Sequence, residues 1–364
     1  MTQPVRQLAP ALVKSDLWWT DKGAPIFGLI YLLLAVDPAR PGLPTTLLAL
    51  LLFVMAFAGI AGFGYVVNDL FDLRADALAG KRNTMAGRSP PARAGLVLGL
   101  GLLGFLPWAF WPGPPEAALG MLMLQTLLLI VYAVPPLRLK ERHVAGPVCD
   151  ALYAFTVPLL ITLAAWLPLG RSQPLPPLLP ALLAVLLLGT LSTGLRGILL
   201  HQIRDAENDR RAGLRTFATT VGVDAVWRML VRRVLPLDAL ACGLSLLMMA
   251  WLLPVFGGFL LLVLGLSLFK WVYLCDRPLT LREGLLRPET PEKVLELWGQ
   301  GALGILRTRT IPLGLVLALA WDSPLHLPLL LLHLLLFRPL QLSVVREDLR
   351  WTPAALRKLF GLRD

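Results

Sequence analysis

Three aspartates, Asp69, Asp72 and Asp76, stand three and four residues apart directly after a long apolar run. On an α-helix this spacing places the three carboxylates on one face, one above another. Like charges so close together repel, so a neutralising partner is expected. Mg²⁺ prefers oxygen ligands and usually takes one or two carboxylates together with the phosphates of a substrate. The stretch therefore predicts a metal–phosphate site at a helix end; the alternative is a solvated helix end that carries acids by chance.

A second acidic cluster follows the apolar run 178–200. Asp205 and Asp209 are four residues apart, and Gln202 and, roughly, His201 share their helix face. Glu207 points elsewhere and is expected to pair with an arginine. The second and sixth apolar runs thus end alike, which indicates duplication of a four-helix unit.

Two carboxylate clusters surrounded by Lys and Arg favour one chemistry. Divalent cations can bridge the carboxylates to a diphosphate, while basic side chains take its remaining oxygens. If the diphosphate is esterified to an allylic lipid, the same groups stabilise the leaving group, and the C–O bond can ionise to a carbocation. No Walker loop, Rossmann glycine pattern or Ser/His/Asp constellation competes with this interpretation.

The elements that must position these clusters are membrane helices. Of 364 residues, 56% are hydrophobic and only 16% are charged, against roughly 25% charged in a soluble domain. Several runs reach the roughly 20 apolar residues that a bilayer requires. The composition therefore predicts an all-α polytopic bundle and argues against a soluble helical core. The expected spans are 24–36, 47–67, 94–111, 117–135, 147–168, 178–202, 234–253, 256–274, 310–321 and 325–339.

Basic residues concentrate in the loops after the even-numbered spans, which the positive-inside rule places in the cytoplasm. The rule predicts a multi-pass protein of the cell (inner) membrane with a cytoplasmic N-terminus and active site. Ten crossings are favoured over nine, and Arg307 and Arg309 make the ninth span short. The net charge of +11 suits anionic lipid or a phosphorylated substrate, and its place in short loops argues against nucleic acid.

The chain is expected to form one membrane-embedded domain, 1–364. Residues 1–23 are predicted to be an interfacial segment, with Trp18 and Trp19 as anchors. Residues 276–306 form either a cytoplasmic cap-like loop or a tether. Residues 340–364 form a basic cytoplasmic tail. The three cysteines have neither metal spacing nor a disulfide pattern.

Three motifs in this sequence resemble those of the UbiA-type membrane-embedded prenyltransferases. Each lies at the end of an even-numbered span. The first is Asn68, Asp69, Asp72 and Asp76; the second is Asp205, Asp209, Arg210, Gly213 and Thr216; the third is Tyr132, Pro135, Pro136, Arg138 and Lys140. The resemblance covers roughly residues 15 to 275 and implies a helical fold of about nine to ten spans with its active site at the cytoplasmic face.

The resemblance also implies roles for individual residues. Catalytic aspartates that hold Mg²⁺ would be Asp69, Asp72, Asp76, Asp205 and Asp209. Substrate-binding residues would be Asn68, Arg82, Arg88, Tyr132, Arg138, Lys140, Gln202 and Arg215. Among these, Asn68 would contact metal or phosphate, and Tyr132 would shape the lipid or acceptor pocket.

The sequence departs from the family pattern at one place. Many members carry Lys-Asp where this chain has His201 and Gln202. The change leaves open a weaker second metal site or a different acceptor, and His201 is either a proton acceptor or structural. Arg196, inside the sixth span, either snorkels or pairs with Asp150.

The leading hypothesis is Mg²⁺-dependent transfer of a prenyl group from a polyprenyl diphosphate to a hydrophobic acceptor, aromatic or lipid, at the membrane. A second hypothesis keeps the site but transfers a phosphoribosyl group from a sugar diphosphate to a polyprenyl phosphate. A third is a non-catalytic protein that binds or transports isoprenoid lipids, although all five motif aspartates are present. An ion-coupled transporter is disfavoured because the carboxylates lie at one membrane face.

Overall fold

The computed structural model describes residues 18–37, 39–169, 174–274 and 303–338, and within these ranges the regular structure is entirely helical. The α-helices are α3 (Ala24–Val36), α4 (Leu43–Phe71), α5 (Leu73–Leu78), α6 (Pro90–Phe105), α7 (Glu116–Ala133), α8 (Ala145–Ala151), α9 (Val157–Trp166), α10 (Leu178–Arg211), α11 (Phe217–Val221), α12 (Val223–Met229), α13 (Leu235–Leu252), α14 (Pro254–Leu274), α16 (Leu303–Ile305), α17 (Ile311–Asp322) and α18 (Leu327–Leu336). Short π-type or 3₁₀ turns join or precede several of them at Trp19–Gly23, Leu106–Phe110, Leu139–Glu141, Leu152–Thr156, Leu230–Val234, Leu306–Thr310 and Pro324–His326.

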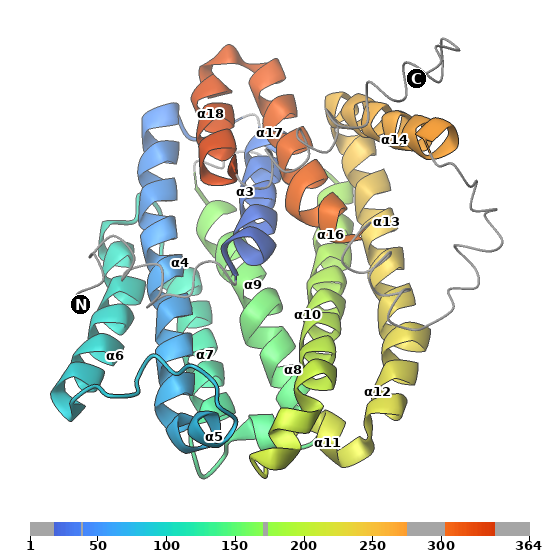
Figure 1. Cartoon of the computed structure of the whole chain (residues 1–364). Helices are drawn as coiled ribbons and strands as arrows, with labels where there is room; N and C mark the ends of the chain where they lie inside the picture. Colours follow the sequence, from blue (N-terminus) through green and yellow to red (C-terminus); the bar gives the residue numbers. More distant parts are fainter. Residues whose placement is uncertain (1–17, 38, 170–173, 275–302, 339–364) are drawn as a thin grey trace, which may run out of the picture.

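Eight helical segments in the described residues are long and apolar enough to cross a membrane. They confirm the prediction of an all-α polytopic bundle. The other two predicted spans coincide with shorter apolar helices, Pro254–Leu266 within α14 and Pro324–Leu336. Figure 1 shows that α14 lies across the upper end of the bundle instead of running alongside its neighbour α13.

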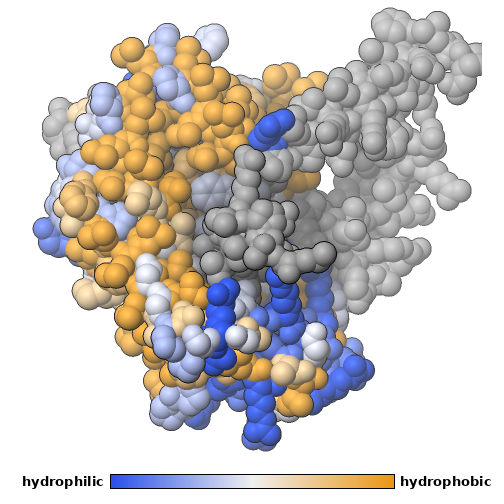
Figure 2. Space-filling model, turned by 60° about the vertical axis from the view of Figure 1, so that its left-hand side comes forward, coloured by the Kyte–Doolittle hydropathy of each residue, from blue (hydrophilic) through white to orange (hydrophobic). Residues whose placement is uncertain are grey.

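Two helices are longer than a membrane requires, and both carry an acidic cluster. α4 has 29 residues and α10 has 34, which correspond to about 43 Å and about 51 Å at 1.5 Å per residue, against a hydrocarbon core of about 30 Å. Their polar C-terminal ends emerge at the same end of the bundle, where α5 and α11 follow them (Figure 1). Figure 2 shows hydrophilic residues gathered at this lower end, with a largely hydrophobic surface above it.

A buried ion cluster joins three membrane helices and corrects two expectations. Asp238 of α13 is fully buried, and Arg196 of α10 donates to it at 2.8 Å instead of pairing with Asp150. Arg307 lies 2.7 Å from the same carboxylate. Because Asp238 neutralises Arg307, the ninth span is not short: it extends over Leu303–Asp322.

The two tryptophans near the start of the described chain have different surroundings. Trp18 is 2% exposed and packs edge-on against Phe57, with 5.1 Å between ring centroids, so the expectation of an interfacial anchor is wrong for this residue. Trp19 stacks on Phe337. The predicted tail 340–364, residues 1–17 of the interfacial segment and residues 276–302 of the cap-like loop lie outside the described residues; residues 303–306 are helical.

Candidate active site

The acidic ends of α4 and α10, which lie at the lower end of the bundle (Figure 1), border a cavity of about 700 Å³. Four motif aspartates line it: Asp72, Asp76, Asp205 and Asp209. The cavity continues into the bundle between α4, α7, α9 and α10, where its walls become apolar. The apolar lining includes Phe57, Ile60, Ala61, Leu129, Phe155 and Pro158. The lining from Phe57 to Asn68 follows α4 for about 16 Å at 1.5 Å per residue.

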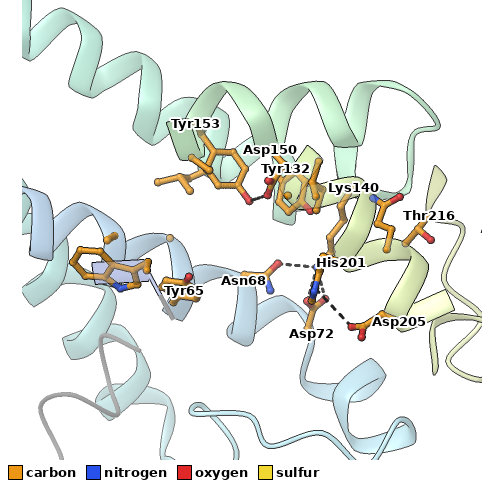
Figure 3. Close-up of a pocket in the computed structure, with 18 of the residues that line it drawn as sticks. Tyr65, Asn68, Asp72, Tyr132, Lys140, Asp150, Tyr153, His201, Asp205 and Thr216 are labelled. Atoms are coloured by element: carbon orange, nitrogen blue, oxygen red, sulfur yellow. Dashed lines mark hydrogen bonds and ion pairs between the residues drawn. The ribbon is translucent and has the colours of Figure 1, made fainter. Parts of the chain in front are cut away.

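Asp72 is the centre of the first cluster. The Lys140 ammonium lies 2.5 Å from both of its carboxylate oxygens, and the Arg138 guanidinium lies 3.0 Å from one of them. Lys140 also donates to the Asn68 amide oxygen at 2.9 Å. Burial lowers the pKa of Lys140, and the charge of Asp72 opposes that effect. The third motif thus delivers two cations to one carboxylate, and Figure 3 shows the contact from Lys140.

Lys140 reaches the site because of the local backbone that its motif forms. The chain leaves α7 at Ala133, and Arg138 adopts a left-handed conformation with φ 39°. That residue starts the short 3₁₀ turn Leu139–Glu141, which carries Lys140 into the protein. Arg138 also donates to the Phe71 carbonyl at 3.2 Å, so the turn is attached directly to the end of α4.

The first cluster does not lie on one continuous helix. α4 ends at Phe71, Asp72 has non-helical backbone angles, and α5 begins at Leu73. Asp76 therefore lies on a separate short helix, where its carboxylate accepts a hydrogen bond from Asn83 at 2.7 Å. Burial raises the pKa of the Asp76 carboxyl, and the Asn83 hydrogen bond opposes this.

Both clusters end in the same helix-terminating turn. Gly80 and Gly213 have φ values of 66° and 70°, a left-handed conformation that glycine adopts without steric cost. After Gly80, the Lys81 N–H donates to the Asp76 carbonyl; after Gly213, the Leu214 N–H donates to the Asp209 carbonyl. This is the Schellman arrangement, with the last motif aspartate at the same position in each.

The two clusters correspond position by position at a constant offset along the chain. The pairs are Asn68 and His201, Asp69 and Gln202, Asp72 and Asp205, Asp76 and Asp209, Gly80 and Gly213, and Asn83 and Thr216. The correspondence extends to hydrogen bonds: Asn83 donates to Asp76, and Thr216 donates to Asp209 at 3.3 Å. The local geometry therefore supports the duplication that the sequence suggested.

This correspondence explains the departure at Gln202. Asp69 is 3% exposed, and its Oδ2 accepts hydrogen bonds from the N–H and the hydroxyl of Thr84, at 3.0 and 2.6 Å. Gln202 is 4% exposed, and its Oε1 accepts a hydrogen bond from the Ala218 N–H at 3.2 Å. In each half, this side chain accepts a hydrogen bond from the segment that follows the helix and so attaches that segment to the helix. An amide oxygen can accept such a hydrogen bond, as a carboxylate oxygen does.

Lys81 connects the two clusters, and the sequence analysis did not select it as a site residue. Its ammonium lies 2.6 Å from Asp205. Burial lowers the pKa of Lys81, but the hydrogen bond to Asp205 and the nearby charges of Asp209 and Asp76 outweigh burial and raise the pKa. The feature of the sequence that could have identified Lys81 as a site residue is its position directly after Gly80, which ends the helix, and two residues before Asn83.

Other predicted residues lie apart from the cavity. Five predicted site residues are not among the described residues that line it: Asp69, Arg82, Arg88, Arg138 and Arg215. Arg82 and Arg215 are exposed, whereas the Arg88 guanidinium donates to the Thr84 carbonyl at 2.8 Å. Tyr132 and Gln202 do line the cavity.

The polar end of the cavity, here called its mouth, is the part lined by the four motif aspartates and Asn68, and its donor atoms suit a hard cation. Four carboxylates and the Asn68 amide supply oxygen, the ligand type that Mg²⁺ prefers. Within the described ranges, no three His, Cys, Asp or Glu side chains converge on one point. The carboxylates thus flank the cavity from two sides, which fits an ion that takes few protein ligands and completes its shell with phosphate and water.

Comparisons with known proteins agree with this geometry. Residues 25–281 match the model of the UbiA prenyltransferase family. A lycopene elongase/hydratase of Haloferax volcanii is 30% identical over 162 residues, which are 44% of this chain and only about half, 48%, of that protein. A lycopene elongase/hydratase of Corynebacterium glutamicum is 29% identical over 253 residues, 65% of this chain and 77% of that protein.

Solved structures share the fold. A UbiA homolog from Archaeoglobus fulgidus bound to DMAPP and Mg²⁺ has a TM-score of 0.51 and 16% identity, covering 84% of this chain and 98% of that chain. A structure described for digeranylgeranylglyceryl phosphate synthase in membranes also has a TM-score of 0.51 and 16% identity, covering 86% and 98%.

Proposed function

The chain belongs to the UbiA prenyltransferase family, and from that premise we propose that it transfers a prenyl group from an allylic diphosphate to an apolar acceptor at the membrane. One observation carries the proposal: carboxylates from the end of α4, from α5 and from α10 line the mouth of a cavity whose deeper walls are apolar. A diphosphate head group would lie among the carboxylates and cations, and its hydrocarbon would extend between the spans.

The residues at the mouth of the cavity would bind the diphosphate head group in two ways, through Mg²⁺ and directly. Asp72, Asp76, Asp205 and Asp209, with the Asn68 amide, are the ligands available to Mg²⁺, and bound Mg²⁺ neutralises the diphosphate as a leaving group. Lys140, Arg138 and Lys81 are the cations within reach of these carboxylates. They bind the remaining phosphate oxygens by charge-assisted hydrogen bonds. The Archaeoglobus homolog bound to DMAPP and Mg²⁺ supports an allylic diphosphate with Mg²⁺ as the occupant.

We propose that the acceptor is a long polyene hydrocarbon of the lycopene type. The relatives named lycopene elongase/hydratase support this choice. The apolar side chains that line the cavity, such as Phe57, Leu129 and Pro158, support it too, because such walls suit an acceptor that has no polar head group.

The location of the site follows the distribution of charge. The loops beside the three motifs carry basic side chains, among them Lys81, Arg138 and Arg215, and the positive-inside rule assigns such loops to the cytoplasm. We therefore propose a protein of the cell membrane whose N-terminus and active site face the cytoplasm, with the whole chain forming one domain. The described chain enters α3 at the end nearer this face, as Figure 1 shows.

The test combines purified protein in lipid nanodiscs with labelled dimethylallyl diphosphate, Mg²⁺ and lycopene. We expect a labelled product and release of diphosphate, both abolished by EDTA and by Asp72→Asn or Asp205→Asn. Glu207→Gln is the matched control, because Glu207 lies on the same helix as Asp205 but pairs with Arg210 and Arg211 at the surface. Diphosphate release that persists in Asp72→Asn plus Asp205→Asn would refute the proposed roles.

A further inference from the structure

The cavity wall across from the acidic mouth carries a polar group that head-group binding does not use. Asp150, near the end of α8, lines the cavity, and the Tyr153 hydroxyl donates a hydrogen bond to its Oδ1 (Figure 3). Within the described part of the chain, no other hydrogen bond and no lysine or arginine ion pair involves this carboxylate. A carboxylate inside a membrane span is costly, and such residues are usually functional.

The groups around Asp150 come from several elements of the cavity wall. The Tyr132 ring packs edge-on against Tyr153, with 5.1 Å between centroids. The neighbouring Cys149 thiol is directed elsewhere, toward the Leu128 carbonyl. The charged or titratable groups that act on Asp150 from other elements are Lys22, before α3, and His201, on α10. Asp150 therefore lines the cavity with Oδ1 bonded to Tyr153, and Oδ2 has no hydrogen bond within the described residues.

The other carboxylates of the cavity already have partners. Asp72 pairs with Lys140, Asp205 with Lys81, and Glu141 with Arg138. Asp76 and Asp209 accept hydrogen bonds from Asn83 and Thr216. The remaining carboxylates among the described lining residues are Asp150, bonded only to Tyr153, and the exposed Asp21.

We propose that Asp150 is the proton acceptor of the coupling reaction; the inference rests on the proposed function. The C1–O bond of the donor breaks, and its electron pair leaves with the diphosphate. The π electrons of the acceptor double bond form the new C–C bond to C1, which leaves the positive charge on the adjacent acceptor carbon. A neighbouring C–H bond then gives its electron pair to a new double bond and its proton to Asp150 Oδ2.

Tyr153 positions this carboxylate and does not itself take the proton. Its hydroxyl occupies Oδ1, so Oδ2 is the oxygen that can receive one. Removal of that hydroxyl should leave a carboxylate of the same charge but freer orientation, and so a smaller loss than removal of the carboxylate.

An acceptor-free reaction tests the inference without knowledge of the acceptor. Wild type and Asp150→Asn are incubated with geranyl diphosphate and Mg²⁺, and diphosphate release is measured together with the hydrocarbon and alcohol by-products. Hydrocarbon formation requires a base that takes a proton from carbon, which is the role assigned to Asp150, whereas alcohol formation can give its proton to water. We expect Asp150→Asn to release diphosphate within about threefold of wild type, while its hydrocarbon-to-alcohol ratio falls about 100-fold, as loss of a general base predicts.

Three further variants complete the experiment. Asp150→Glu should restore part of the ratio, Tyr153→Phe should lower it about tenfold, and Asp21→Asn should leave it unchanged. An unchanged ratio in Asp150→Asn overturns the inference, as does a wild type that releases diphosphate without any hydrocarbon. Equal losses of diphosphate release and hydrocarbon in Asp150→Asn indicate a structural role and also overturn it. A wild type that releases no diphosphate from any allylic donor instead refutes the proposed function.

Discussion

Replacement of Asp69 by asparagine separates attachment of the loop from metal binding. In the structure this carboxylate accepts hydrogen bonds from the backbone and the hydroxyl of Thr84, which fixes the loop that carries Lys81. The corresponding position in the second half is Gln202, an amide in the same kind of contact. Asn should therefore serve at position 69 nearly as well as Asp.

The magnitude follows from the hydrogen bonds that change. Hydrogen bonds to a charged group contribute about 1.5–3 kcal/mol and neutral ones about 0.5–1.5 kcal/mol, so Asp69→Asn should cost about 1–2 kcal/mol of stability. Asp69→Ala leaves a buried N–H without its acceptor and should cost about 1–3 kcal/mol more. Because the amide oxygen that Asp69→Asn introduces can still accept from Thr84 and keep the loop that carries Lys81 attached, diphosphate release in this variant should stay within about fivefold of wild type. Asp72→Asn should lose about 100-fold or more, the scale of a lost transition-state contact.

The assay measures diphosphate release at saturating Mg²⁺, together with thermal unfolding in the same nanodiscs. Gln202→Glu provides the reciprocal control: it places a carboxylate in the second half, and it should not change the Mg²⁺ concentration required for half-maximal rate. If Asp69→Asn loses as much activity as Asp72→Asn at an unchanged unfolding temperature, Asp69 is a metal ligand, as the motif alone predicts, and the reasoning from Thr84 fails.

Three further predictions concern the turn and the cations. Lys81→Met should raise the KM for the diphosphate about tenfold, since one phosphate-binding cation at about 1.4 kcal/mol corresponds to that factor; a raised kcat at constant KM would contradict it. Gly213→Ala should lower stability by about 1 kcal/mol because its φ is 70°, whereas Gly95→Ala, in helix α6 with open space around the added methyl group, should stabilise by about 0.5–1 kcal/mol; equal unfolding temperatures for the two variants would refute the argument. Because burial lowers the pKa of Lys140, kcat/KM should fall as pH rises through that lowered pKa, when the ammonium loses its charge; Lys140→Arg should move this alkaline limb to higher pH, and a limb that does not move would assign it to another group.

The sequence was sufficient to predict the helices and the two acidic clusters, because apolar length and i, i+4 spacing are local properties. The interruption of α4 at Asp72 was not predictable from spacing, since caps and turns beyond the helix decide it. The role of Lys81 was missed for a related reason: a basic residue in a cytoplasmic loop is already explained by the positive-inside rule.

Partners that are distant in the sequence were the least predictable. Asp150 was a candidate partner for Arg196, whereas the structure brings Asp238, 42 residues away, to that arginine. Arg307, which the sequence analysis took as the limit of a span, meets the same carboxylate. Charge balance within a membrane depends on which helices pack together, and the period of one helix does not contain that information.

The cluster around Asp238 has a consequence for how the protein is made. Its three charges lie on segments that the ribosome delivers in order: Arg196 first, Asp238 next and Arg307 last. Placing an isolated charge such as Asp238 in lipid costs about 2.5–3.5 kcal/mol, and the ion pair with Arg196 lowers this cost. Arg307, on the segment made last, then pairs with the same carboxylate. In a cell-free translocation assay, membrane integration of residues 303–322 should therefore decline when Asp238 is replaced by Leu, because Arg307 loses its counter-ion. Integration should recover in the double variant that also carries Arg307→Leu, because the arginine that lost its counter-ion is then absent from the segment.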